Sequence, residues 1–196
     1  MAAPKILTPT AYEYLVHERN ALDKHELVDG QIVAMAGASP THNQINFNLT
    51  VAIGARLRGT SCRGAANDQK VRVDSGRLFA YPDLVIFCDQ PRYLDEDKDV
   101  LLNPKVIVEV LSPSTELFDR GRKFALYQES ESLQEYVLVS QDHQQVEIFR
   151  RNPSQDGKVT WSYQSLREGD LSLESVGVVV PIAEIFELVE FVPAAL

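Results

Sequence analysis

Two short apolar runs place the strongest constraint on how this chain can fold. DLVIFC (83–88) and KVIVEVLS (105–112) are continuous and rich in β-branched side chains. Runs of this length and composition are typical of strands that are buried on both faces of a sheet. The sequence therefore predicts a central sheet whose inner strands have no face in contact with water.

The segment 39–59 predicts the longest helix of the chain. Apolar residues recur at every fourth position along it: Ile45, Leu49, Ile53 and Leu57. Ser39 is suited to the N-cap, Pro40 to the first helical position, and Gly59 to the residue that ends the helix. One side of this helix is therefore expected to pack on the sheet.

The remaining segments interleave strands and helices. Helices are expected at 10–18 and 115–130, and hairpins at 25–35, with Asp29-Gly30 as the turn, and at 135–151. Single strands are expected at 67–74, where polar and apolar residues alternate, and at 159–166. A strand that passes into a short helix is expected at 178–189. This order predicts an α/β (α+β) fold with a mixed central β-sheet flanked by helices. We expect a single domain over residues 1–196, with its core at about 10–150 and C-terminal strands and a short helix at 158–192.

Composition narrows the classes of function. The chain carries 19 Lys+Arg against 28 Asp+Glu, a formal net charge of −9. This balance counts against a protein that coats DNA, but less against an enzyme whose metal ions supply positive charge locally. No stretch is long and apolar enough to span a membrane, and no secretory signal is visible. Cys62 and Cys88 form no CxxC spacing, so cytoplasmic residence with reduced thiols is expected.

Glu109 is a carboxylate in the middle of the apolar run VIVEVL. In a central strand, a carboxylate costs several kcal/mol unless it is paired, protonated or bound to a cation. Val106, Val108 and Val110 would share one face of the strand, and Glu109 would lie on the other with Ile107 and Leu111. A functional Glu109 and a Glu109 that merely faces water remain equally open from this pattern.

Asp83 follows Pro82 immediately before the other apolar run. Pro-Asp pairs are common in turns, so Asp83 by itself is interpreted as a turn residue. Together with Glu109, however, it would complete a pair of carboxylates on neighbouring strands. Such a pair is an oxygen-ligand site for a hard divalent cation, which can activate water and offset charge on a phosphate.

Four further residues are weaker candidates for the same site. Glu26 begins the first hairpin, where a solvated glutamate is the simpler interpretation. Lys123 is expected at the border of the inward face of the second helix, a face formed by Leu117, Phe124 and Tyr127, with Asp119 four residues earlier as a pairing partner. His42 lies in the first turn of the long helix, where a surface position and a neutral imidazole are expected.

Several segments, in this order, resemble the PD-(D/E)xK nuclease superfamily and, more narrowly, the Uma-two family of restriction endonucleases. They are ELVDGQI, SPTHNQI, YPDLVIF, VIVEVLSPST, DRGRKFALY and LQEYVLVS. The resemblance implies a restriction-endonuclease-like core. It also implies Asp83, Glu109 and the backbone carbonyl of Val110 as ligands of Mg²⁺ (or Mn²⁺), with Glu26 as an accessory acid.

The chain departs from the superfamily pattern at one position. The motif lysine should follow Glu109 by two residues, where this chain has Leu111. The resemblance therefore implies Lys123 as the catalytic lysine. Lys70 and Arg72 are the alternative residues that could supply the positive charge. It implies Mg²⁺-dependent hydrolysis of phosphodiester bonds in DNA by a homodimer. Two alternatives remain. One is a nuclease-like domain that has lost activity and binds nucleic acid or a protein partner. The other is a structural protein in which Glu109 has its hydrogen-bonding or charge partners and no catalytic role.

Overall fold

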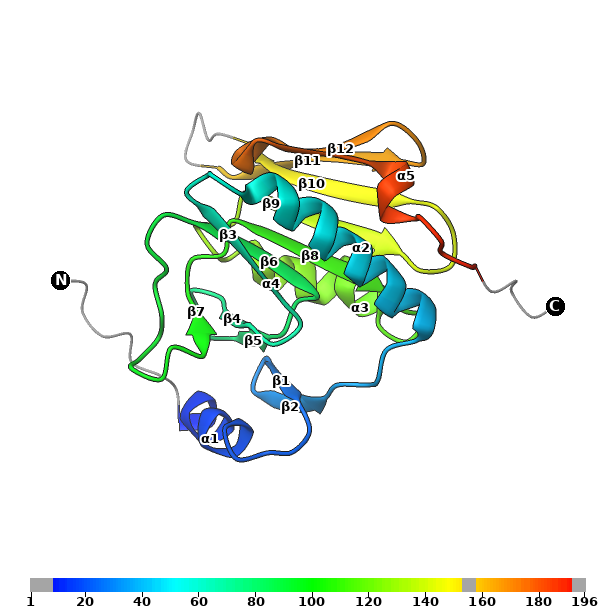
Figure 1. Ribbon diagram of the computed structural model, residues 1–196. Helices are drawn as coiled ribbons and strands as arrows, with labels where there is room; N and C mark the ends of the chain where they lie inside the picture. Colours follow the sequence, from blue (N-terminus) through cyan, green and yellow to red (C-terminus); the bar gives the residue numbers. More distant parts are fainter. Residues whose placement is uncertain (1–8, 153–157, 192–196) are drawn as a thin grey trace.

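The centre of the structure is a mixed sheet with helices on both faces (Figure 1). The computed structural model describes residues 9–152 and 158–191. The sheet has the strand order β11-β10-β9-β8-β6-β3, and its members are β3 (Cys62–Ala66), β6 (Leu84–Cys88), β8 (Val106–Leu111), β9 (Glu135–Ser140), β10 (Val146–Asn152) and β11 (Thr160–Leu166). Strands β8 and β9 are parallel and the other neighbours antiparallel. The predicted α+β class is confirmed.

Helix α2 (Pro40–Leu57) covers one face of this sheet (Figure 1). The Ser39 hydroxyl accepts a hydrogen bond from the His42 N–H at 3.0 Å, which caps the helix as the sequence predicts. The residues of its predicted stripe are buried against Val106, Val108 and Val110 of β8. Gly59, with φ +79°, follows the end of the helix.

The second predicted helix, which covers the opposite face, is not continuous. It consists of α3 (Glu116–Phe118), a π-helical turn η1 (Asp119–Lys123) and α4 (Phe124–Tyr127). A π turn holds more residues than an α turn, so the faces predicted from a regular period do not persist through it. The expected inward position of Leu117 is therefore wrong, since this residue is 90% exposed, whereas Lys123 is only 5% exposed.

A second sheet has the order β2-β1-β5-β4-β7. Its strands are β1 (His25–Val28), β2 (Gln31–Ala34), β4 (Lys70–Arg72), β5 (Leu78–Ala80) and β7 (Val100–Leu101). Helix α1 (Pro9–Glu18) packs on it through Tyr14 and Leu15. The predicted hairpin is confirmed, with positive φ at both Asp29 and Gly30. The predicted alternation of β4 is wrong, because all of its residues are buried.

The C-terminal part packs on α2 (Figure 1). It contains β12 (Asp170–Leu173), which the sequence did not predict, the 3-10 turn η2 (Glu174–Val176), β13 (Val178–Pro181) and α5 (Ile182–Ile185). The division into a single domain stays a prediction. Across the parts of the chain that the structure describes, no helix combines the length and apolar character needed to cross a membrane.

The expectation of reduced thiols is wrong. Cys62 and Cys88 face each other in the antiparallel pairing of β3 with β6 and form a disulfide. The strand register brings together two residues that are 26 positions apart in the sequence, and spacing alone does not reveal this.

Reduction of this disulfide is expected to lower the free energy of unfolding by about 3 kcal/mol, because the cross-link restricts the unfolded chain. Denaturant unfolding with and without dithiothreitol measures the change. A Cys62→Ser/Cys88→Ser variant is the control and should not respond to the reductant. An equal response of both proteins would contradict the assignment of the effect to this disulfide.

Candidate active site

The register of β6 against β8 determines where the two predicted carboxylates lie. Leu84 pairs with Val108, so Asp83 lies beside the end of β8 that carries Glu109. The Val110 N–H donates a hydrogen bond to Asp83 Oδ2 at 2.7 Å, which fixes the carboxylate at this strand end. Glu109 is 4% exposed and lies on the opposite face of β8 from the residues that contact α2.

A cleft of about 670 Å³ opens at this end of the sheet. The predicted site residues among those that line it are Glu26, His42, Asp83, Glu109, Val110, Asp119 and Lys123. Lys70 is not among them: its Nζ lies 3.4 Å from Asp99 and over the rings of Tyr14 and Tyr81. Arg72 lies over the ring of Phe79. The structure thus gathers all the predicted site residues except Lys70 and Arg72.

Lys123 lies between the carboxylates. Its Nζ is 3.0 Å from Glu26 Oε1, 3.0 Å from Glu109 Oε1 and 3.7 Å from Asp119 Oδ1. A lysine at the border of a helix face can extend to water or reach over a strand end toward the carboxylates, and Lys123 does the second. The solvated interpretation of Glu26 is wrong, because its side chain is largely buried. The π turn brings Lys123 inward, and the β1–β5 pairing brings Glu26 to the same point.

The cluster contains more negative than positive charge. Burial raises the pKa of Glu109 well above its ordinary value, and the charges of Asp119, Asp83 and Glu26 add to this effect while Lys123 opposes it. Burial likewise raises the pKa of Asp119. For Lys123, burial lowers the pKa but the surrounding carboxylates raise it by more. Three carboxylates thus share one buried lysine, and the surplus negative charge favours uptake of protons or of a cation.

His42 extends from the first turn of α2 toward Asp83. Its Nε2 lies 3.3 Å from Asp83 Oδ2, and its side chain is 13% exposed, so the predicted surface position is wrong. Burial lowers the pKa of His42, but the hydrogen bond and attraction to Asp83 outweigh burial, and the net direction is upward. The helix dipole disfavours an imidazolium at this position, whereas the neighbouring Asp83 carboxylate favours it.

Three other groups hold the acidic residues, and the sequence did not reveal them. The Tyr127 hydroxyl donates to Glu109 Oε1 at 3.1 Å, and the Tyr81 N–H donates to Glu26 Oε1 at 3.1 Å. The Asn46 amide lies 3.5 Å from Asp83 Oδ1 and 2.6 Å from Asn67 Oδ1. Only Asn46 had a usable signal, since a polar residue beside the buried stripe of a helix calls for a polar partner.

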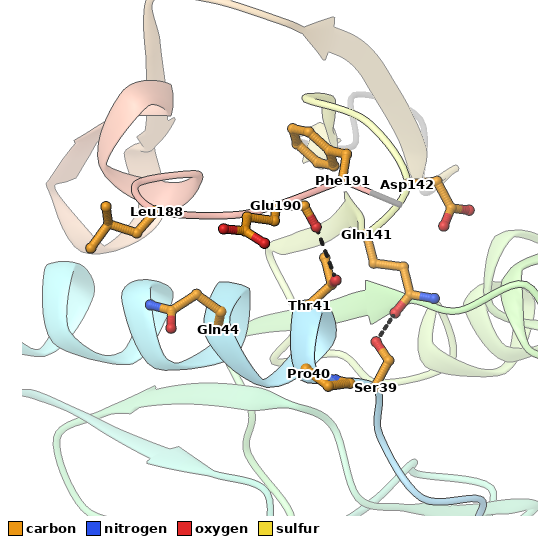
Figure 2. Close-up of a pocket in the computed structure, with 9 residues that line it drawn as sticks. All are labelled: Ser39, Pro40, Thr41, Gln44, Gln141, Asp142, Leu188, Glu190 and Phe191. Atoms are coloured by element: carbon orange, nitrogen blue, oxygen red, sulfur yellow. Dashed lines mark hydrogen bonds between the residues drawn. The ribbon is translucent and has the colours of Figure 1, made fainter. Parts of the chain in front are cut away.

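A second pocket, of about 630 Å³, lies against the cleft (Figure 2). Ser39 and Gln141 line both spaces, and the Ser39 hydroxyl donates to Gln141 Oε1 at 2.8 Å. On the other side of this pocket the Thr41 hydroxyl donates to the Glu190 carbonyl at 3.2 Å, which holds the C-terminal segment against α2. Ser39, the N-cap of α2, therefore forms part of the wall between the pocket and the cleft.

The fit of the cleft to a divalent cation depends on how its oxygen donors are arranged. Within residues 9–152 and 158–191, no group of three or more His, Cys, Asp or Glu side chains is arranged to hold a metal ion. One physical reason is that the Lys123 ammonium lies between Glu26 and Glu109. Asp83, Glu109 and the Val110 carbonyl nevertheless offer hard oxygen donors at one strand end, and Mg²⁺ commonly binds one or two carboxylates and completes its shell with water. The residues present therefore fit such an ion.

The structure is that of an α+β protein with a cluster of carboxylates around one buried lysine at the end of a central sheet. A crystal structure described as that of "a putative nuclease belonging to DUF820" from Anabaena variabilis matches with a TM-score of 0.72. The match covers 91% of this chain and 98% of that chain at 17% sequence identity, so it shows the fold alone.

The chain belongs to the Uma2 family, which is described as "Putative restriction endonuclease" and whose family model matches residues 11–179. The predicted family is therefore confirmed. Two proteins of Synechocystis sp. are each 34% identical: slr1290, over 91% of this chain and 92% of the relative, and sll1609, over 77% and 84%. Both of these relatives are described as uncharacterized.

Proposed function

We propose that this protein is a metal-dependent endonuclease that hydrolyses phosphodiester bonds of DNA at the Asp83–Glu109–Lys123 cluster. The observation that supports this most is the position of Lys123 Nζ, 3.0 Å from both Glu26 and Glu109. A buried lysine among carboxylates beside a strand-end aspartate combines the two requirements of phosphoryl chemistry, cation ligands and a fixed positive charge.

The residues divide into ligands and supporting groups. Asp83, Glu109 and the Val110 carbonyl would hold Mg²⁺ or Mn²⁺. The bound ion would lower the pKa of a coordinated water and offset the charge of the phosphate. Lys123 would orient the attacking water and donate to a non-bridging phosphate oxygen, while Glu26 and Asp119 hold its ammonium in place. Hydrolysis would leave a 5′-phosphate and a 3′-hydroxyl.

His42 and Asn46 would act through Asp83. Both lie beside its carboxylate, His42 against Oδ2 and Asn46 against Oδ1. Because the Val110 N–H also donates to Oδ2, that oxygen is well supplied with donors, and Oδ1 is the atom better able to bind a cation. We infer that His42 and Asn46 are positioning residues.

Chelation is expected to abolish nicking of supercoiled plasmid DNA, and added Mg²⁺ or Mn²⁺ to restore it, because water activation and charge neutralisation both depend on the ion. Calorimetric titration with Mn²⁺ should give binding in the wild type and none in Asp83→Asn. Asp142→Asn removes an exposed carboxylate outside the cleft and serves as the matched control, with binding and nicking unchanged.

The titration also separates this function from its alternatives. A nuclease-like domain that only binds nucleic acid or a protein partner has no need of a cation site and should give no Mn²⁺ binding in any variant. Nicking that persists in Asp83→Asn would contradict the assignment of the site. Parallel assays on DNA and RNA of the same sequence test the choice of DNA as substrate.

We further propose that the active form is a homodimer. One cleft can cut one strand of a duplex, and a second copy supplies the second cleft. Sedimentation velocity of the purified chain measures the oligomeric state directly, and a monomer that nevertheless produces double-strand breaks would contradict this proposal.

A further inference from the structure

Strand β3 forms one edge of the central sheet and ends at the cleft. Asn67, which follows β3, lines the cleft, and its N–H donates to the Asp83 carbonyl at 3.1 Å. Because β3 has a neighbour on one side only, its outer backbone groups are not used by another described strand. Its side chains at Gly64, Ala65 and Ala66 are small, so a ligand could approach this edge closely.

Arg58 and Arg63 lie at the other end of this edge. Both are exposed, and both line a pocket of about 290 Å³ between the last turns of α2 and β3. The other residues of that pocket include Gly54 and Gly64, and no acidic residue lines it. Apolar side chains, among them Ile53, Leu57 and Leu84, form much of the pocket wall, and Arg58 and Arg63 are its only charged lining residues, in a chain whose net charge is −9.

These two arginines differ from most others in the described part of the chain. Ion pairs with carboxylates neutralise the arginines at 19, 56, 77, 120, 122 and 150. Arg58 and Arg63 make no ion pair with a described residue. The dipole of α2 stabilises a cation at the C-terminal end of the helix, which explains the unpaired Arg58. The dipole does not explain the unpaired Arg63, which lies on β3. Exposed, unpaired cations beside a pocket are the features expected of a surface that meets anionic ligands.

The separation along β3 suits a nucleic acid. Asn67, at the cleft end, lies four residues after Arg63, a separation of roughly 13 Å at about 3.3 Å per residue. The phosphates of a duplex strand wind around the axis, so neighbouring phosphates are roughly 6–7 Å apart although the axial rise is about 3.4 Å per nucleotide, and this length corresponds to about two nucleotides. Guanidinium groups bind phosphate with two parallel hydrogen bonds, which suits two arginines at one pocket.

We propose that the Arg58–Arg63 pocket is a subsite for a backbone phosphate of nucleic acid, about two nucleotides from the phosphate at the cleft, with the strand running along β3. This inference deepens the proposed nuclease function and rests on it for the identity of the substrate. The surface itself, however, can be tested by binding alone.

The test compares two double variants that remove the same charge. Arg58→Ala/Arg63→Ala removes the unpaired arginines, and Arg77→Ala/Arg122→Ala removes two exposed arginines that are neutralised by Asp29. Fluorescence anisotropy of a labelled duplex DNA is measured in EDTA, where no cleavage occurs, over a range of salt concentrations. The first variant should bind about tenfold more weakly, and the magnitude of its slope of log affinity against log salt should fall by about 0.9, the value for one phosphate contact. The second should match the wild type, and Arg58→Lys/Arg63→Lys should retain most of the affinity.

Three outcomes would overturn the inference. The first is an equal loss in both alanine variants, which would reflect net charge alone. The second is a wild type that does not bind DNA in this assay. The third is a wild-type dimer that dissociates in Arg58→Ala/Arg63→Ala without DNA, since the edge would then be an interface between copies.

Hydrolysis of bis-p-nitrophenyl phosphate separates this inference from the proposed function. This phosphodiester is too short to reach from the cleft to Arg58 and Arg63, so the alanine double variant should hydrolyse it at the wild-type rate while cutting DNA more slowly. A wild type that hydrolyses neither substrate would contradict the nuclease function, and the anisotropy result would still decide the phosphate subsite.

Discussion

Replacement of Lys123 by methionine is expected to reduce DNA cleavage by at least about 10²–10³-fold and to lower the free energy of unfolding near neutral pH by about 3–5 kcal/mol. Both effects have one cause. The ammonium is 3.0 Å from Glu26 and from Glu109, and no other cation lies in contact with these two carboxylates among the described residues. Methionine preserves much of the volume of the side chain, but it leaves buried negative charges without a partner.

The loss of stability in Lys123→Met should depend on pH in a defined direction. Lys123 opposes the rise in the pKa of Glu109 and of Asp119, so without the lysine the folded-state pKa of both groups rises further above the unfolded value. A group with a raised folded-state pKa contributes stability that is present at low pH and lost as the pH rises through the folded-state value. The variant should therefore approach the wild type in acid and fall furthest behind it at neutral pH and above. Urea unfolding across this range measures the difference.

Lys158→Met is the matched control, because Lys158 is exposed and outside the cleft. It should leave both nicking and stability unchanged. Full nicking activity in Lys123→Met would show that the lysine of the helix does not replace the motif lysine of the strand.

Replacement of Glu109 by glutamine is expected to separate stability from function. Burial raises the pKa of Glu109 well above its ordinary value of 4.5, so the ionised side chain opposes folding. The contribution of this group to stability is therefore fully present below about pH 4.5 and is lost as the pH rises through the folded-state value. Glutamine does not ionise and can still accept the hydrogen bond from Tyr127. At pH 8 the variant should thus be at least as stable as the wild type, while cleavage falls by more than about 100-fold because a cation ligand is lost.

The double variant Lys123→Met/Glu109→Gln tests both arguments at once. Removing a buried charge together with its partner costs less than removing one of them, so the double variant should recover part of the stability lost in Lys123→Met. It should remain inactive. A double variant no more stable than Lys123→Met would indicate that Glu26 and Asp119, rather than Glu109, carry the unpaired charge.

The parts of the fold that follow local rules were predictable. The buried strands β6 and β8, the capped helix α2 and the Asp29-Gly30 hairpin all follow from apolar pattern, capping and turn chemistry in short windows of sequence. The pairing of Asp83 with Glu109 followed from the same strands. The partners that come from distant parts of the chain were not predictable in this way, as with Cys62 and Cys88 or with His42 and Asp83.

Lys123 shows why the site was harder to predict than the fold. A regular helical period places it at the border of the inward face, and one π turn is enough to bury it. The turn is favoured by a tertiary arrangement, three carboxylates around one ammonium, and not by a local sequence signal. Resemblance to a family nominated this lysine, whereas its burial emerged only from the folded structure.

Because the lysine lies on a helical segment and not on β8, its position relative to Glu109 can change during evolution. Leu111, at the position of the motif lysine, is 3% exposed and packs in the same apolar cluster as Phe124 of α4. Glu109 and Lys123 thus lie on two different elements, β8 and η1, which are held together in part by this apolar cluster. Substitutions that alter the packing between β8 and α4 could change how far the lysine extends toward the carboxylates without changing any charged residue. Related chains can therefore keep every acidic side chain and still differ in their rate of cleavage.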